Sequence, residues 1–219
     1  MATPKKFYIA DTHYFHENVI RFDNRPFETI EEMNKTMLEN WNSAVHPRDT
    51  VYILGDFIWH RNPETIKFLR KLHGSKILVQ GNHDRLFLNG ETKKLFSNVS
   101  PYREGRDSGY RVVMCHYPIP LHAHHRRENT IHLYGHVHTT QEYRVALNHF
   151  NQVKDDPLLE HKAREYNVGC MLPWMDYTPR TLGEIVERAE VHKDWLDKFM
   201  FWSGLEYIKA KQSLREERS

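Results

Sequence analysis

Cysteine is scarce in this sequence, and long apolar runs are missing. The 219 residues contain two cysteines, Cys115 and Cys170, which are too few for a disulfide framework and predict a protein of a reducing compartment. No stretch approaches the roughly 20 consecutive apolar residues that a membrane span needs. The first residues lead directly into an expected strand at residues 6–10, with no apolar signal region. We therefore expect a cytoplasmic protein with no membrane partner.

Net charge is also small, which argues against one class of partner. Lysine and arginine number 31 against 29 acidic residues, leaving a formal charge of +2 at pH 7. Because no basic stripe is present, long nucleic acid is a poor expectation as a partner, and a nuclease acting on it is disfavoured. An apolar fraction of 39% and a charged fraction of 27% are typical of a globular protein. The length suits one domain with a small appendage.

Histidine, in contrast, is abundant. The chain has 16 histidines, and half of them fall in one segment: His116, His122, His124, His125, His132, His136, His138 and His149. Their internal position argues against an expression tag. A histidine-rich segment is then either a solvated surface or a metal-binding region.

Five short apolar runs each end in side chains that can bind metal. We expect strands at residues 6–10, 51–54, 75–79, 112–115 and 131–134. They are followed by Asp11-Thr12-His13, Gly55-Asp56, Gly81-Asn82-His83-Asp84, His116 and Gly135-His136-Val137-His138. Each motif alone is typical of a turn, but five in order, each after a strand, indicate a site. In an open α/β sheet, ligands collect outside the carboxyl ends of the strands.

Helix signals separate the first three strands. Thr29 and Glu32 have the spacing of a capping box, which predicts a helix through about Val45. Asn62 and Pro63 predict the start of a second helix, which ends at residue 74. The first half therefore reads β-α-β-α-β, the pattern of a parallel sheet with right-handed crossovers.

The second half predicts less regular structure. We expect a hairpin over residues 102–115 with its turn at 106–109, short strands at 141–145 and 165–168, and a polar loop or short helix at 148–162. Thr181 and Glu184 form a further capping box that opens a helical tail, which Ser203-Gly204 can divide in two. We divide the chain into a domain of residues 1–187 and a helical extension of residues 188–219. The aromatic stripe of the extension predicts either core packing or a homo-oligomer interface.

The chemical types of the predicted donor side chains limit which metal ions can bind. Seven side chains at the strand ends offer oxygen or imidazole and none offers thiolate: Asp11, His13, Asp56, Asn82, His116, His136 and His138. Such donors suit manganese, iron, nickel, cobalt or zinc in an open catalytic site and disfavour a closed structural zinc site. In extended backbone, residues two apart project to the same side, so each Asp-x-His or His-x-His pair can converge on one centre. Asp56 follows the second strand as its only carboxylate and can bridge two cations.

These motifs resemble those of the calcineurin-like metallophosphoesterase superfamily, D-x-H, G-D, G-N-H-D/E, a lone H and G-H-x-H, over roughly residues 5–187. The sequence looks most like small bacterial and phage members. The resemblance implies an α/β fold with a β-sandwich of two mixed sheets flanked by helices, of which the parallel sheet above is half. It also implies two divalent transition-metal ions, manganese first. One would take Asp11, His13, Asp56 and His138, and the other Asp56, Asn82, His116 and His136.

One difference between this sequence and the superfamily motifs argues against one kind of phosphatase. Phosphoprotein phosphatases follow Gly-Asp with a further Asp-Arg pair that orients the catalytic histidine, and residues 55–61 here contain no such aspartate. This counts against a protein phosphatase and leaves Asp84 as the nearest candidate to orient His83. Further expected pocket residues, none of which is a metal donor in this scheme, are His16, Asn18, Trp59, His60, Arg85, His124 and Arg126. The last two belong to a loop at 121–127 that we expect to overhang the metals.

We therefore predict a dinuclear metal-dependent phosphohydrolase. The expected reaction is that of a phosphodiesterase on a small or nucleotide-derived phosphate ester, with a metal-bridging hydroxide as nucleophile. His83 and Asp84 are the predicted catalytic residues, and His83 would protonate the leaving oxygen or stabilise charge. A phosphomonoesterase is the alternative within the class, and a non-catalytic interaction subunit of the same fold is the alternative outside it. The complete donor set, together with His83, favours an enzyme.

Overall fold

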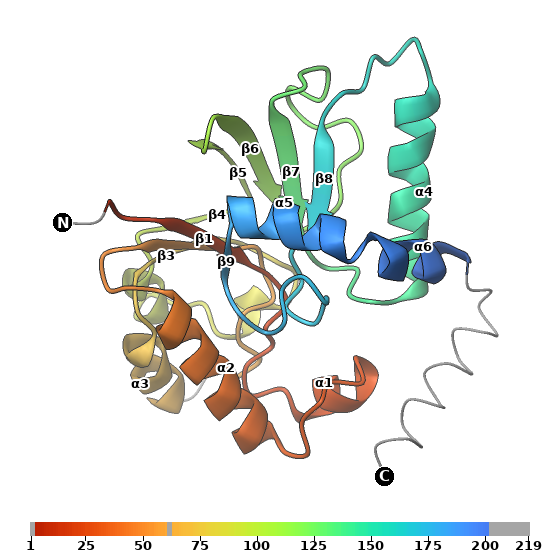
Figure 1. Ribbon diagram of the computed structural model, residues 1–219. Coiled ribbons are helices and arrows are strands. Elements are labelled where there is room, and N and C mark those ends of the chain that lie inside the picture. Colours follow the sequence, from red (N-terminus) through yellow and green to blue (C-terminus); the bar gives the residue numbers. More distant parts are fainter. Residues whose placement is uncertain (1–2, 61–62, 202–219) are drawn as a thin grey trace.

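Two mixed β-sheets, with helices outside them, form the centre of the fold (Figure 1). The computed structural model describes residues 3–60 and 63–201, and the statements below concern that part of the chain. The expected architecture, two mixed sheets flanked by helices, is confirmed. Among these residues no helix is both long and apolar enough to cross a membrane.

The first sheet has five strands in the order β4-β3-β2-β1-β9. Its strands are β1 (Lys6–Ile9), β2 (Thr50–Ile53), β3 (Ser75–Val79), β4 (Asn98–Ser100) and β9 (Arg180–Thr181). The first four are parallel to their neighbours, and β9 pairs antiparallel with β1. The parallel sheet expected from the first half is confirmed. Its strands read as nearly continuous apolar runs because both faces of the sheet are covered.

Helices α2 (Ile30–Ala44) and α3 (Pro63–Lys71) cover one face of this sheet, and α1 (Glu17–Phe22) lies beyond the strand ends (Figure 1). The short 3₁₀ helices η1 (Asp84–Leu86) and η2 (Thr92–Leu95) follow β3. The predicted helix at 29–45 is confirmed. Thr29 caps it by accepting a hydrogen bond from the backbone N–H of Glu32 at 3.1 Å, and its apolar face buries Met33, Met37 and Trp41. The predicted cap Asn62 lies outside the described residues.

The second sheet has four strands in the order β5-β6-β7-β8. They are β5 (Tyr102–Asp107), β6 (Tyr110–Cys115), β7 (Thr130–Tyr134) and β8 (Arg164–Asn167). β5 and β6 form the predicted hairpin, and both turn residues, Ser108 and Gly109, have positive φ, as a tight hairpin turn requires. The remaining pairs are parallel. The strand predicted at 165–168 is β8.

One predicted strand is wrong. Residues 141–145 are the first turns of α4 (Gln141–Asp155), which also includes half of the segment 148–162 that was expected as a polar loop or short helix. Thr140 caps the helix by accepting a hydrogen bond from the N–H of Glu142. Tyr143, Ala146 and Phe150 are buried at helical spacing. Over five residues this pattern cannot be distinguished from strand alternation, and the following polar turns hid the helix.

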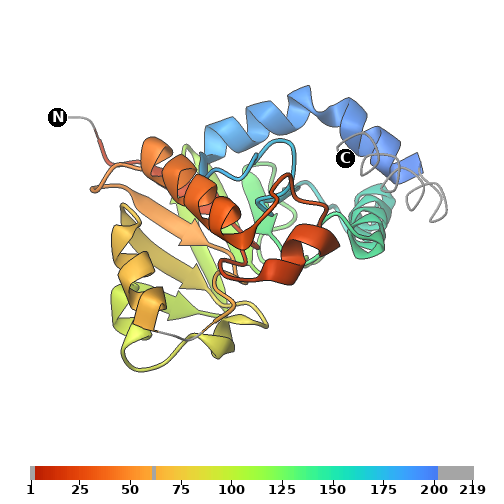
Figure 2. The ribbon, with the colours of Figure 1, turned by 90° about the horizontal axis from the view of Figure 1, so that it is seen from below.

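The chain ends its described part in two helices, α5 (Leu182–Val191) and α6 (Lys193–Phe201). Thr181 and Glu184 form the predicted capping box. α5 contacts β1, β8 and β9, so it spans the edges of both sheets, and α6 continues toward the end of α4 (Figure 2). The predicted domain boundary at residue 187 falls inside α5, and the division stays a prediction. Residues 202–219, including the expected break at Ser203-Gly204, lie outside the described part.

Candidate metal centre

The seven side chains predicted as metal donors lie together at the strand ends of both sheets. Two groups have their donor atoms within 4.8 Å of one another: Asp11, His13 and His138 in the first, and Asp56, His116 and His136 in the second. The seventh donor, Asn82, joins the second group, because its Oδ1 lies 3.0 Å from Nε2 of His116. The strands thus bring together all seven donors, and their role as ligands stays a prediction.

Asp56 joins the two groups through a single oxygen. Its Oδ2 lies 3.7 Å from Nε2 of His13 in the first group and 3.6 Å from Nε2 of His116 in the second. Neighbouring ligands of an ion with bonds of about 2.0–2.2 Å stand roughly 3.0–3.6 Å apart, so these separations are close to those of a coordination shell. A carboxylate in this position can serve both groups at once.

The hydrogen bonds of His116 show that the second group fits a cation. His116 donates from Nδ1 to the carbonyl oxygen of Leu54 at 2.8 Å, so its Nε2 carries a lone pair. That lone pair faces two other acceptors, Oδ1 of Asn82 and Oδ2 of Asp56. Converging acceptors repel one another unless a cation lies between them. Burial also lowers the pKa of His116 to about 4, which keeps the imidazole in the neutral form that binds metal.

Left-handed backbone at the strand ends aims the donors. Five of the seven have positive φ: Asp11 (54°), His13 (48°), Asp56 (51°), His136 (72°) and His138 (45°). The expectation that the paired donors converge from extended backbone is therefore wrong. Left-handed backbone turns Asp11 and His13 toward the first group, whereas His136 and His138 are divided between the two groups, His138 in the first and His136 in the second. Such conformations cost roughly 1–3 kcal/mol each and gather at functional sites, where the surrounding structure imposes them.

Motif glycines let the turns approach one another. Gly55 has a φ of 84°, and a Cβ there would overlap the imidazole of His116. A Cβ on Gly81 would lie 2.5 Å from Oδ1 of Asp56. The glycines before Asp56 and Asn82 are thus required because backbone passes directly against a donor side chain.

A buried acid and a buried arginine, both missed by the sequence analysis, support the first group. Nδ1 of His138 donates to Oδ1 of Asp23 at 2.7 Å. Arg25 donates to the other oxygen of Asp23 from Nε at 3.1 Å and from Nη2 at 2.9 Å. It also donates to the backbone oxygens of Asp11 and Thr12 at 2.8 Å each. Burial raises the pKa of Asp23, but the charge of Arg25 outweighs it and brings the pKa to about 2. Asp23 therefore stays ionised and fixes the tautomer of His138.

We expect Asp23→Asn to weaken metal binding by about 10- to 100-fold, the usual effect of losing the partner that orients a ligating histidine. The neutral amide is a weaker acceptor for His138, and Arg25 loses its carboxylate. Calorimetric titration with Mn²⁺ on chain shown to be folded measures the affinity. Glu17→Gln, which removes an exposed carboxylate of α1, is the matched control. Equal affinity in both variants would show that Asp23 does not support the donors.

Asp84, which was predicted to be catalytic, accepts hydrogen bonds from backbone N–H groups with both oxygens of its carboxylate. It is fully buried. Its Oδ2 accepts hydrogen bonds from the N–H groups of Asp56 and Gly81, and its Oδ1 accepts one from Phe57. It therefore ties the turn after β2 to the turn after β3. Burial, partly offset by these bonds, raises the pKa of Asp84 to about 6.

His83 stands at the open side of the donors. Its side chain is 39% exposed, and its Nε2 lies 3.9 Å from Oδ2 of Asp56. Its backbone N–H donates to Oδ1 of the same carboxylate at 2.9 Å. In residues 3–60 and 63–201 no carboxylate is hydrogen bonded to the imidazole, and the indole of Trp59 packs against it, with ring centroids 4.6 Å apart.

Comparison with known proteins identifies the family. Residues 6–171 match the family model of the calcineurin-like phosphoesterase superfamily domain. The chain belongs to the calcineurin-like phosphoesterase superfamily. It is 32% identical over 195 residues to the uncharacterized protein MJ1445 of Methanocaldococcus jannaschii, covering 88% of this chain and 96% of that one. It is 25% identical to the Gene 66 protein of Mycobacterium phage L5, over 84% of this chain and 83% of that protein.

A solved relative has the same fold. The protein of unknown function AQ665 from Aquifex aeolicus superposes with a TM-score of 0.62 at 28% identity, covering 84% of this chain and 99% of that one. Membership of the calcineurin-like phosphoesterase superfamily supports phosphoesterase activity, and the two donor groups are its candidate metal ligands.

A cavity of about 400 Å³ opens over the donors of this superfamily member. Its lining combines donor residues with a wall from α1 and the loop after β2: His13, His16, Val19, Phe22, Asp23, Asp56, Trp59, Asn82, His83, His136, His138 and Thr140. His16 stacks on Trp59 with centroids 3.7 Å apart and planes 11° apart. Burial, with Arg25 nearby, lowers the pKa of His16 to about 4, so the stacked pair of His16 and Trp59 is aromatic and uncharged. His16 and Trp59 were both expected in the pocket.

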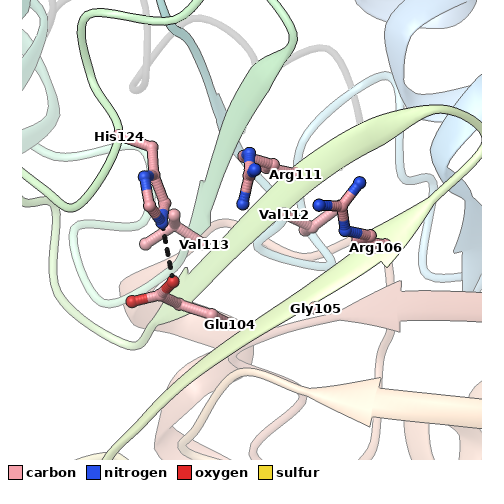
Figure 3. Close-up of a pocket in the computed structure, with 7 residues that line it drawn as sticks. All are labelled: Glu104, Gly105, Arg106, Arg111, Val112, Val113 and His124. Atoms are coloured by element: carbon pink, nitrogen blue, oxygen red, sulfur yellow. Dashed lines mark hydrogen bonds and ion pairs between the residues drawn. The ribbon is translucent and has the colours of Figure 1, made fainter.

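Other expected pocket residues lie elsewhere. His124 lines a separate cavity of about 240 Å³ with Arg106 and Arg111 of the β5–β6 hairpin, and Figure 3 shows it pointing at Glu104. Its Nε2 lies 3.2 Å from Oε2 of Glu104. The loop at 121–127 therefore does not carry His124 over the metal donors as expected. His124 instead lies beside residues of β5 and β6.

The remaining expected contacts are also absent from the lining of the metal cavity. Asn18, His60, Arg85 and Arg126 are exposed side chains of the described chain and do not line it. Their predicted substrate contacts stay predictions. The lining includes Phe22 and Thr140, which the sequence analysis did not predict.

Proposed function

We propose that this chain is a dinuclear metal-dependent phosphohydrolase acting as a phosphodiesterase on a small or nucleotide-derived phosphate ester. The observation that carries the proposal is the position of Oδ2 of Asp56, which is shared by both donor groups at the floor of an open cavity. When bound, two divalent transition-metal ions would supply a water of lowered pKa and neutralise charge on the phosphoryl oxygens. We keep manganese, a cytoplasmic location and a homo-oligomer through the C-terminal helices as parts of the proposal.

Asp56, Asp84 and His83 have separate roles in the proposed reaction. Asp56 would bind both ions, and the two donor groups would hold one each. Asp84 keeps the turns after β2 and β3 in register, so that the donors are preorganised before substrate arrives. His83 is exposed, is not needed as a donor and lies at the cavity mouth. From Nε2 it would give a proton to the leaving oxygen or stabilise charge on the phosphoryl group.

The wall of the cavity favours a substrate with a flat apolar part. A volume of about 400 Å³ lies within the range of roughly 300–1,000 Å³ found for small-molecule sites. Trp59, His16 and the 57%-exposed Phe22 offer ring surface beside the donors. A nucleobase stacks on such surface, and each stacked base is worth about 1–3 kcal/mol. This is why a nucleotide-derived ester is preferred over a bare alkyl ester.

A substrate panel tests the function. The purified chain is loaded with Mn²⁺ and assayed on phosphomonoesters, phosphodiesters and cyclic nucleotides. We expect kcat/KM for diesters to exceed that for monoesters by at least about tenfold, since a diester oxygen can carry the second substituent into the aromatic wall. A monoester preference would assign the phosphomonoesterase function. Two bound metals without hydrolysis of any ester would assign a non-catalytic interaction subunit.

Trp59→Ala tests the aromatic wall separately. We expect KM for nucleotide esters to rise by about 5- to 100-fold, the equivalent of one lost stacking contact. Alkyl phosphodiesters, which have no ring, serve as the control substrates and should keep their KM. If KM rises equally for both kinds of ester, Trp59 does not recognise a base. Because Trp59 also packs against His83, a fall of kcat on both kinds of ester would measure its orienting effect.

A further inference from the structure

A second cluster of metal-binding side chains lies in the four-stranded sheet region, outside the cavity of the metal centre. His122 follows β6, His161 precedes β8, and Glu165 belongs to β8. Their donor atoms all lie within 4.8 Å of one another. The side chains of both histidines are 0% exposed, and that of Glu165 is 3% exposed. None of the three is among the lining residues of the metal cavity.

Each of these side chains has one buried nitrogen or oxygen atom with no hydrogen-bond partner among the described residues. Nδ1 of His122 donates to the carbonyl oxygen of Ala123 at 2.9 Å, so its Nε2 carries a lone pair. Nε2 of His161 lies 3.0 Å from the carbonyl oxygen of Pro120 and 3.3 Å from Oε1 of Glu165. Because both neighbours are acceptors, Nε2 of His161 carries the hydrogen and Nδ1 the lone pair.

Glu165 completes the set. Lys154 of α4 pairs with its Oε2 at 2.5 Å, and its Oε1 remains. Across the described chain, Nε2 of His122, Nδ1 of His161 and Oε1 of Glu165 are buried without any hydrogen-bond partner. One water molecule has two hydrogens and cannot satisfy three acceptors. A cation can, because all three atoms present lone pairs.

We infer that His122, His161 and Glu165 form a third metal site, separate from the proposed dinuclear centre, for a divalent transition-metal ion such as zinc. Two imidazoles and one carboxylate are the donors that zinc takes in three-ligand sites, with a fourth position left for water. Lys154 places a positive charge beside the carboxylate, so the site binds its ion more weakly than the dinuclear centre does. The ion uses Oε1 while Lys154 keeps Oε2.

A neighbouring histidine shows that this arrangement is specific. The ring of His132 lies 4.8 Å from that of His122 and is equally buried. Both of its nitrogens are engaged, however. Nδ1 donates to the carbonyl oxygen of Val113, and Nε2 accepts from the N–H of Ile119, each at 3.1 Å. His132 is therefore a satisfied core residue, whereas His122, His161 and Glu165 each keep a buried atom without a hydrogen-bond partner among the described residues.

The site joins two segments that run beside the metal centre. The N–H groups of Lys162 and Ala163 both donate to the carbonyl oxygen of His125, at 2.8 and 2.9 Å, so the loop after β6 already lies on the segment before β8. The same loop begins at Tyr117, whose ring centroid is 4.7 Å from that of His136. A metal ion at His122, His161 and Glu165 cross-links the loop to β8 and holds Tyr117 beside the donors.

Metal stoichiometry of the full chain tests the site. The protein is stripped with a chelator, reloaded with Zn²⁺ or with Co²⁺, desalted, and its metal content measured. We expect three equivalents in the unaltered chain and two in both His122→Ala and Glu165→Gln, which keep the dinuclear centre. His124→Ala is the matched control, because it lies two residues from His122 and pairs with Glu104 instead. It should keep three equivalents.

A crystallographic measurement keeps the test independent of the variants. In crystals of the unaltered chain loaded with Zn²⁺, an anomalous difference map at the zinc edge should show a peak between Nε2 of His122 and Oε1 of Glu165. Loss of one equivalent in Glu165→Gln, which is close in shape to the native residue, would support the site even if His122→Ala fails to fold. A map with peaks at the dinuclear centre and none at this cluster would overturn it.

Discussion

Asp56→Asn is expected to lose metal and hydrolysis together while the chain stays folded. Its Oδ2 is the atom within 3.6–3.9 Å of three imidazoles, those of His13, His83 and His116. An amide nitrogen in its place cannot bind a cation and leaves both donor groups one ligand short. The oxygen that remains can still accept the hydrogen bond from the backbone of His83, which is why the turn should hold.

The expected size follows from the shared position. Losing the charge that both ions share should lower kcat/KM by at least about 10³-fold, since several kcal/mol of transition-state stabilisation pass through the ions. Elemental analysis should show the metal content falling from two equivalents at the dinuclear centre toward zero. Asp155→Asn, an exposed carboxylate at the end of α4, is the control and should change neither quantity. Two retained equivalents with full activity would contradict the bridging role.

His83→Ala is expected to reduce activity in a way that depends on the leaving group. A nitrophenolate leaves without a proton, whereas an alkyl or nucleoside alkoxide needs one. The loss should therefore be small with nitrophenyl esters and reach about 10²–10⁴ with alkyl or nucleoside esters, the usual contribution of a positioned general acid. Metal content should stay intact, because all seven donors remain.

The structure supplies a matched control for this variant. His60 is an exposed histidine that does not line the cavity, so His60→Ala should leave every ester unaffected. Equal losses across the leaving-group series in His83→Ala, at full metal occupancy, would remove the general-acid role and leave electrostatic stabilisation of the phosphoryl group. Loss of metal would instead make His83 a ligand.

His138 is held in place by a buried ion pair between Asp23 and Arg25. Arg25 is a buried cation that binds Asp23 and the backbone of Asp11 and Thr12 at once. One residue therefore positions a donor side chain and the turn that carries two more donors. Removing a single partner from such a buried ion pair destabilises a fold by roughly 3–5 kcal/mol. For this reason the proposed variant of Asp23 is the amide, which keeps the shape and one acceptor oxygen.

The metal centre could be predicted from the sequence because each donor is close along the chain to the strand and turn that position it. Each donor lies within four residues of a strand end, and glycine marks three of the five turns. Strand, turn and donor are therefore read in one short window. Once the strands are parallel, their carboxyl ends meet at one edge whatever the rest of the chain does. The alternation of strands and helices likewise predicted the first sheet.

Only the tertiary structure showed which residues form hydrogen bonds with the donor side chains or pack next to them. Asp23 and His138 are 115 positions apart, and neither Asp23 nor Arg25 follows a strand or a glycine turn. His124 and His122 belong to the same loop, yet one pairs with an exposed glutamate and the other enters the interior. No local pattern separates such residues, because burial and hydrogen-bond partners are set by how distant segments pack.

The sequence by itself predicted the parallel sheet of the first half and the seven candidate donors, since these depend on short-range spacing and on strand ends that converge. The two-sheet fold followed from the resemblance of the motifs to the superfamily. Only the tertiary structure decided that left-handed backbone aims the donors, that Asp84 binds backbone amides, and that Trp59 packs on His83. It alone also brought His122, His161 and Glu165 into one buried cluster. The physical reason is that desolvation and lone-pair direction, which give a polar side chain its role, exist only after distant segments have packed together.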